Sequence, residues 1–226
     1  MNITREIAAK VLKVVDAGLV SGVGNPKPGE MCVEAAVCFA LGLPHGDEPG
    51  CVAPALRSLK ISLNDRSWSS KEARAKGLRR LALAQLGSAG HLDEKEFRRR
   101  IVDIALRKSC PAALRSAASV CKDHTHKATL LDAASRCEKE GTRQAALDAR
   151  AVARAADADA YAAAAAYAAY ADADAAAYAD ADAAYADADA RDKSLAAYAE
   201  DVVQVLIEMK APGVQWLDLA PLEQAA

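Results

Sequence analysis

Residues 161–190 read YAAAAAYAAYADADAAAYADADAAYADADA, and this stretch decides the fold class. Alanine has the highest intrinsic helix propensity, and 28 of the fifty residues 151–200 are alanine. Neither glycine nor proline occurs between Thr142, which is a suitable N-cap, and Ala211. The pattern predicts a long Ala/Tyr/Asp-rich helix that begins near Thr142.

The length of this helix and its end follow from the same stretch. If the helix reaches Ala190, it is about 73 Å long at about 1.5 Å per residue. A compact chain of this size has a radius of gyration of only about 17 Å, so we expect the helix to project from the rest. A new apolar set begins after Arg191–Ser194, where we expect a break followed by a C-terminal helix over 195–210.

The tyrosines and aspartates of the stretch are its candidate binding residues. The motif YADAD recurs at steps of 8 and 7 residues, close to two helical turns. Three tyrosines then share one face, which we expect to pack on another helix, as in a homo-oligomer. The aspartates either solvate the helix or form a row of negative charge that imitates nucleic acid and binds a basic partner. The candidate binding residues are Tyr167, Tyr178, Tyr185, Asp172, Asp174, Asp180, Asp182, Asp187 and Asp189.

Charge divides the chain into two parts. Residues 1–150 hold 25 Lys and Arg against 17 Asp and Glu, a balance of +8. Residues 151–226 hold 4 against 14, a balance of −10, so the net charge of −2 hides a dipolar chain. We therefore predict a basic helical head at 1–140 and an acidic part at 141–226. Negative charge on a rigid helix is expected to steer a basic partner, so this part is predicted to dictate partner choice.

The head shows helical apolar patterns separated by Gly- and Pro-rich turns, and no period-2 alternation. Capping boxes are formed by Ser69 with Glu72 and by Asp93 with Glu96. Pro111 is expected to close or kink its helix, and Gly141 suits a left-handed C-cap. The fold class is therefore all-α, with a compact multi-helix head. The predicted helices of the head are 3–19, 31–41, 52–63, 69–86, 97–107 and 123–141.

The apolar segments and the cysteines indicate the cellular compartment of the protein. No apolar run approaches the roughly 18–20 residues that span a bilayer, and the N-terminus lacks a signal-peptide pattern. No CxxC motif occurs, and several cysteines lie in helical patterns, so we expect unpaired, mostly buried thiols. These features predict no membrane association and a reducing compartment such as the cytoplasm. The six cysteines are Cys32, Cys38, Cys51, Cys110, Cys121 and Cys137.

The sequence predicts no catalytic residue, but an enzymatic function stays open. Cys32 follows a Gly/Pro-rich loop at a predicted helix start, and His45 and Asp47 are near in sequence. A thiol at a helix N-terminus has a lowered pKa, and a histidine can serve as its base. The alternative function is a cysteine-dependent hydrolase or transferase centred on Cys32 and His45.

The sequence also contains candidate residues for a metal site and for nucleic-acid binding. Cys121, His124, His126 and Cys137 are candidate zinc ligands, although their spacing matches no common zinc motif. No phosphate-binding or dinucleotide-binding motif occurs, and no cofactor is expected. Two basic clusters are able to contact phosphates, so nucleic-acid binding by the head is a second alternative function. They are Lys71, Arg74, Lys76, Arg79 and Arg80, and Arg98, Arg99, Arg100, Arg107 and Lys108.

Residues 24–65 (GNPKPGEMCVEAAVCFALGLPHGDEPGCVAPALRSLKISLND) and 68–88 (WSSKEARAKGLRRLALAQLGS) resemble an Ala/Tyr-rich helical family of phages and bacteria. That family shares an acidic Ala/Tyr-rich helix and a closing APG-x-x-WL, here residues 211–217. The resemblance brings no activity, cofactor or site residue. A looser similarity, in composition only, is to helical bacterial immunity proteins. The resemblance implies a mobile-element accessory protein in the cytoplasm of a bacterial host. Such a protein binds a host or competitor protein, with a counter-defence or immunity role. We therefore expect a non-enzymatic interaction protein.

Overall fold

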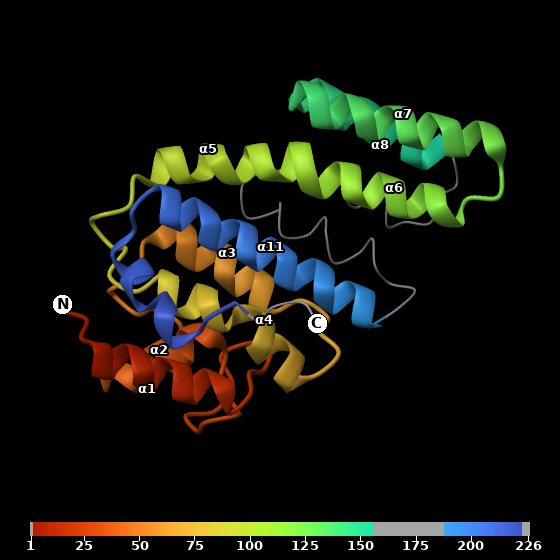
Figure 1. Ribbon diagram of the computed structural model, residues 1–226. Helices are drawn as coiled ribbons and strands as arrows, with labels where there is room; N and C mark the ends of the chain where they lie inside the picture. Colours follow the sequence, from red (N-terminus) through yellow and green to blue (C-terminus); the bar gives the residue numbers. More distant parts are fainter. Residues whose placement is uncertain (1, 156–187, 223–226) are drawn as a thin grey trace. The chain divides into compact units, whose positions relative to one another are not determined.

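The computed structural model describes residues 2–155 and 188–222 (Figure 1). Every regular element in these ranges is a helix, which confirms the predicted all-α class. One isolated antiparallel bridge joins Gly24 to Met31. The predicted long helix falls mostly on residues outside the described ranges, as do the three candidate tyrosines and five of the candidate aspartates. Asp189 lies in a described helix, but its side chain is not described.

The chain divides into two units by internal contacts. Unit 1 comprises Met1–Phe97 and Ala199–Ala226, and unit 2 comprises Arg98–Tyr198. The compositional boundary near residue 140 stays a prediction. Unit 1 is built from α1 (Arg5–Asp16), α2 (Val33–Leu41), α3 (Pro54–Asn64), α4 (Lys71–Ala84), the start of α5 (Glu94–Ile104), the end of α11 (Ala188–Glu208) and the 3₁₀ helix η2 (Pro212–Leu219).

The helices of unit 1 begin at polar side chains that accept backbone N–H bonds. The Thr4 hydroxyl caps α1 and the Ser70 hydroxyl caps α4, the latter at 3.0 Å from the Ala73 nitrogen. The capping box predicted at Ser69 and Glu72 is therefore wrong by one residue, because the adjacent Ser70 is an equally good N-cap. The predicted cap of α5 is confirmed, since Asp93 Oδ1 accepts from the Glu96 nitrogen at 3.0 Å.

α2 forms the centre of unit 1. Its residues are apolar on nearly every side, and all are buried except half-buried Leu41 and Phe39, which is 36% exposed. It packs against α1, α3 and α4. The apolar pattern predicted this burial, because a helix without a polar face has no side to give to water.

The C-terminal segment of unit 1 closes on α1 and α4. The Arg80 guanidinium binds both carboxylate oxygens of Glu200, at 2.9 and 3.2 Å, and the Ala220 carbonyl at 2.6 Å. Arg5 of α1 forms an ion pair with Asp218. Residues 120 or more positions apart in the sequence are thereby joined in one packed unit.

Unit 2 contains the rest of α5, the π-helical turn η1 (Ala105–Ser109), α6 (Cys110–Val120), α7 (His124–Glu140) and α8 (Arg143–Ala155). Helix continues through α5, η1 and α6, so of the two effects predicted for Pro111, closing or kinking the helix, the closing is wrong. Proline cannot donate a backbone hydrogen bond and crowds the preceding turn. The wider π turn directly before it, in which the Cys110 nitrogen donates to the Ala105 carbonyl, lets the helix go on.

The ends of α7 match the sequence pattern. Asp123 Oδ1 accepts from the His126 nitrogen at 2.8 Å, and Gly141 adopts a left-handed C-cap with φ of 59°. Arg107 of η1 completes this C-terminus, because its guanidinium donates to the carbonyls of Glu138, Lys139 and Glu140 at 2.7–3.0 Å. Three of the carbonyls that a helix end leaves unpaired are satisfied by one side chain.

Replacing Arg107 by alanine is expected to destabilise the protein by about 1–3 kcal/mol, since it unpairs three helix-end carbonyls that accept charge-assisted bonds. Chemical denaturation measures the change. The matched control is Arg115→Ala, which removes one surface ion pair with Glu138 and is expected to cost about 1 kcal/mol or less. Equal losses in the two variants would contradict this role of Arg107.

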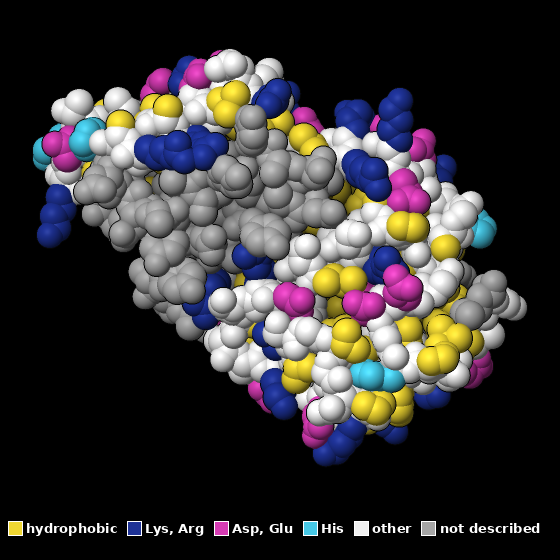
Figure 2. Space-filling model, turned by 180° about the vertical axis from the view of Figure 1, so that it is seen from behind, with side chains coloured by type: hydrophobic (Ala, Val, Ile, Leu, Met, Phe, Trp, Pro, Cys, Tyr) yellow, Lys and Arg dark blue, Asp and Glu magenta, His cyan; other side chains and the backbone are white. Residues whose placement is uncertain are grey.

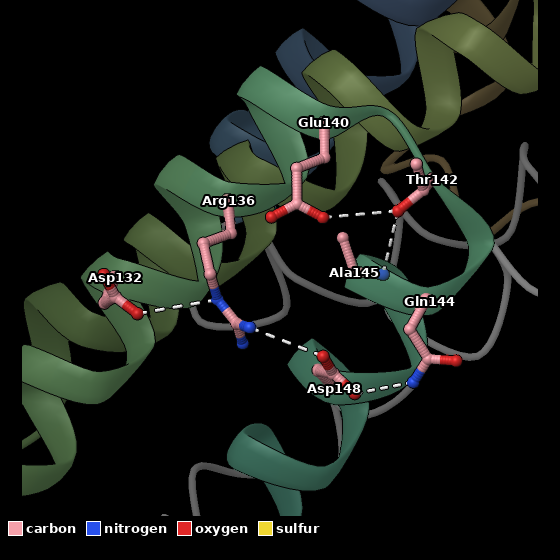
Figure 3. Close-up of polar contacts among 7 residues, drawn as sticks. All are labelled: Asp132, Arg136, Glu140, Thr142, Gln144, Ala145 and Asp148. Carbon is pink, nitrogen blue, oxygen red and sulfur yellow. Dashed lines mark hydrogen bonds and ion pairs between the residues drawn. The ribbon is translucent and has the colours of Figure 1, made fainter.

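α7 and α8 form a helical hairpin whose turn is held by polar side chains (Figure 3). The Thr142 hydroxyl accepts from the Ala145 nitrogen at 3.2 Å, as its predicted role of N-cap requires. Arg136 lies between Asp132 of its own helix and Asp148 of α8, at 3.5 and 3.4 Å. These contacts fix the end of α7 against α8.

α11 is continuous from Ala188 to Glu208. The break predicted at Arg191–Ser194 is therefore wrong, because the change from an alanine pattern to a branched apolar pattern alters the packing face and does not interrupt the helical backbone. No helix within residues 2–155 and 188–222 has the length and apolar character needed to cross a membrane.

Candidate functional site

A pocket of about 260 Å³ lies in unit 1, where the end of α3 meets the loop before α2. Its lining carries two carboxylates, and no lysine, arginine or histidine contributes to it. Apolar atoms of Val23, Val33 and Ile61 form much of its wall. The lining residues are Gly22, Val23, Cys32, Val33, Asp47, Ile61, Asn64 and Asp65.

Asn64 and Asp65, at the end of α3, hold the pocket's backbone. The buried Asn64 side chain accepts from the Val33 nitrogen at 3.2 Å and donates to the Val20 carbonyl at 2.9 Å. Asp65 Oδ1 accepts from the Gly22 nitrogen at 2.7 Å. One helix end therefore fixes the loop on both sides of the pocket, and the site is formed before any ligand enters.

Cys32 contributes a structural thiol to this site. It is the N-cap of α2, and its Sγ accepts from the Ala35 nitrogen at 3.3 Å. Burial raises the pKa of the Cys32 thiol, and this effect outweighs the opposing backbone N–H bonds. A nucleophilic cysteine requires the opposite shift.

The structure places Asp47 in the pocket lining but not His45. His45 is exposed, and its Nε2 lies 2.9 Å from the Gly24 carbonyl oxygen. Within the described part of the chain, no hydrogen bond joins His45 to Cys32. Asp47 is half-buried in the pocket lining with Cys32, and its carboxylate makes no hydrogen bond or ion pair with the described residues. The structure thus brings Cys32 and Asp47 to one pocket, whereas His45, the base expected from the sequence, is not among the lining residues.

The sequence did not reveal a buried polar group in the core of unit 1. Glu34 of α2 and Lys60 of α3 are both inaccessible to solvent, with Lys60 Nζ 3.2 Å from Glu34 Oε1. Gln85, at the end of α4, donates to the other carboxylate oxygen at 3.3 Å. Burial raises the pKa of Glu34 and lowers that of Lys60, while each partner's charge acts in the opposite direction. The signal was available, since Glu34 is a charged residue in a helix that is apolar all round.

The predicted zinc ligands do not converge. Cys121 contacts the Asp123 carbonyl, His126 faces the Asp123 carboxylate, and Cys137 is buried against Cys110. No cluster of three or more ligating side chains occurs among the described residues. The structure therefore does not assemble the metal set considered from the sequence.

The basic residues of α4 are engaged within unit 1. Buried Arg74 donates to the carbonyls of Asn64 and Leu19 at 2.8 and 2.9 Å. Arg79 pairs with Asp16, and Arg80 binds the C-terminal segment. On the face shown in Figure 2, Lys and Arg side chains are interspersed with Asp and Glu. These contacts give Arg74, Arg79 and Arg80 structural roles within the unit, whereas nucleic-acid binding requires a continuous basic surface.

Comparison with protein-family models found no match, and neither the curated proteins nor the solved structures yielded one. Any function of the pocket is therefore inferred from its geometry alone. It combines an acidic lining, an apolar wall and a backbone fixed by Asn64 and Asp65.

Proposed function

We propose that this chain is a non-enzymatic interaction protein that binds a basic partner protein, and that the pocket of unit 1 receives a lysine or arginine side chain of that partner. The observation that carries the proposal is the pocket lining, with two carboxylates and no cation. An alkylammonium or guanidinium group satisfies such a lining, since its charge meets the carboxylates and its methylene stem meets the apolar wall.

The charge of the rest of the chain supports the same class of partner. The acidic part at 141–226 has more Asp and Glu than Lys and Arg, as counted from the sequence, and this net negative charge attracts a basic surface at long range. Following the resemblance to the phage and bacterial family, the partner is a host or competitor protein, and the role is counter-defence or immunity. Self-association through the tyrosine face stays a prediction.

Titration with n-butylammonium, a mimic of the lysine side chain, tests the pocket. We expect saturable NMR shifts at the amides of Gly22, Val23, Asp47 and Asp65, with millimolar affinity typical of a small fragment. Asp47→Asn is expected to weaken binding about threefold to tenfold, because it removes one of two carboxylates without disturbing Asp65.

Two controls accompany this titration. Glu48→Gln changes a neighbouring carboxylate that pairs with Arg57 outside the pocket and should leave the affinity unchanged. The neutral 1-butanol should bind far more weakly than the ammonium. Equal binding of both compounds, or no saturable shift, would show that the pocket does not select cations and would reject the proposal.

A further inference from the structure

Two thiols of unit 2 are in direct contact. Cys110, the first residue of α6, and Cys137, in the last turn of α7, place their Sγ atoms 3.8 Å apart, although 27 positions separate them in the sequence. Both are buried in a cluster of alanine and leucine side chains. Since the two sulfurs face each other across a helix–helix contact, only a small movement separates them from bonding distance.

The π turn η1 places two side chains on this same end of α7. Arg107, within the turn, binds the carbonyls of Glu138 and Glu140, and Cys110, directly after the turn, contacts Cys137. Arg136, which precedes Cys137 in α7, ties the helix to Asp148 of α8 (Figure 3). The segment of α7 that carries Cys137 is therefore held by contacts with both η1 and α8.

The helical backbone is irregular at this point. Pro111 lacks a backbone N–H, and the preceding turn has π geometry, so the backbone around Cys110 forms fewer regular hydrogen bonds than the middle of α6. Local opening gives a small reagent access to buried groups without global unfolding. The two thiols are therefore close to each other, and local opening of the helix beside them would admit a small reagent.

We propose that Cys110 and Cys137 are a redox modification site, oxidised to a disulfide by a low-molecular-weight disulfide such as oxidised glutathione. None of the pocket residues takes part, so this inference is independent of the proposed function.

The reaction balances with these two thiols and one small disulfide. The Cys110 thiol donates to Cys137 Sγ, which favours the Cys137 thiolate and lowers its pKa, whereas the pKa of Cys110 is raised. The Cys137 thiolate attacks one sulfur of the small disulfide and expels one thiolate, which leaves a mixed disulfide. Cys110 then loses its proton and attacks Cys137 Sγ, expelling the second thiolate. Two protein thiols are oxidised, and the small disulfide is reduced to two thiols that take up both protons.

Equilibration of the folded protein in glutathione redox buffers, approached from the reduced and the oxidised side, tests the site. After denaturation and alkylation of the remaining thiols, we expect a species with four alkylated cysteines whose peptide map links Cys110 to Cys137. The oxidised form is expected to melt about 5–10 °C higher, because the cross-link restricts the unfolded chain.

Matched variants test whether Cys110 and Cys137 form the cross-link and cause the rise in melting temperature. Cys110→Ser and Cys137→Ser should each abolish the cross-linked species and the rise in melting temperature. Cys121→Ser removes the half-exposed cysteine of the same unit and should change neither. Six alkylated cysteines at every redox ratio, glutathione adducts without a cross-link, or a link between other cysteines would each overturn the proposal.

Discussion

Gly213→Ala is expected to destabilise unit 1 by about 3 kcal/mol, near the upper end for overpacking, because the added methyl group has no space. A Cβ at this position would lie 2.4 Å from the Leu83 carbonyl oxygen, 2.6 Å from that of Ala84 and 2.7 Å from the Leu86 nitrogen. All three are backbone atoms of the last residues of α4 or of the turn that follows it, so no side-chain rotation relieves the clash. The loss should appear as a lower denaturation midpoint.

We also expect the destabilisation by Gly213→Ala to affect the C-terminal segment first. η2 rests on α4 through this glycine, so its detachment should also release Asp218 from Arg5 and make the C-terminal segment sensitive to protease. Gly50→Ala is the matched control, because nothing lies within 4 Å of a Cβ built there. If Gly213→Ala melts and resists proteolysis like Gly50→Ala, the close contact of η2 with α4 is not structurally important.

Several helix ends in the described residues were predictable from local sequence patterns. Asp123, Gly141 and Thr142 are residues whose chemistry matches a helix end, and each caps a helix as the sequence predicted. The errors came from competition between neighbours or from tertiary context. Ser70 replaced Ser69 as a cap, and the π turn before Pro111 let a helix pass the proline.

The candidate site was only partly predictable. The sequence placed Cys32 at a helix start, which the structure confirms, but capping and burial together give that thiol a structural role. The pocket depends on Asn64 and Asp65, whose side chains reach loop residues about forty positions away. Such contacts exist only once the loop and α3 are packed, and no local pattern indicates them.

Breaking the buried pair of Glu34 and Lys60 is expected to have the largest effect of a side-chain change, about 3–5 kcal/mol, because it leaves one charge buried without its partner. Glu34→Gln keeps an acceptor for Gln85 but removes the carboxylate opposite Lys60. Lys60→Met leaves Glu34 with Gln85 as its remaining partner. Chemical denaturation of each variant measures the loss.

The double variant Glu34→Gln/Lys60→Met measures how much of the loss comes from the interaction between the two side chains. It leaves a neutral amide beside Gln85 and a side chain of similar length in place of Lys60, so neither of these two positions carries a buried charge. We expect it to be more stable than either single variant and within about 1–2 kcal/mol of the parent. Losses that simply add would mean that the two side chains do not interact energetically, despite their 3.2 Å approach.

The pH dependence of Glu34→Gln gives an independent check with a definite sign. Burial lowers the pKa of Lys60, and the Glu34 carboxylate opposes that shift in the parent protein. Without the carboxylate, the folded protein releases the Lys60 proton at lower pH than the unfolded chain, whose lysine titrates near about 10.4. Between those two pKa values the unfolded state binds more protons, so stability rises with pH. The stability difference between the variant and the parent should therefore narrow as the pH rises from about 7 to about 10, because the groups common to both proteins cancel. A difference that is constant or widens over this range would mean that the Lys60 ammonium does not depend on Glu34 for its charge.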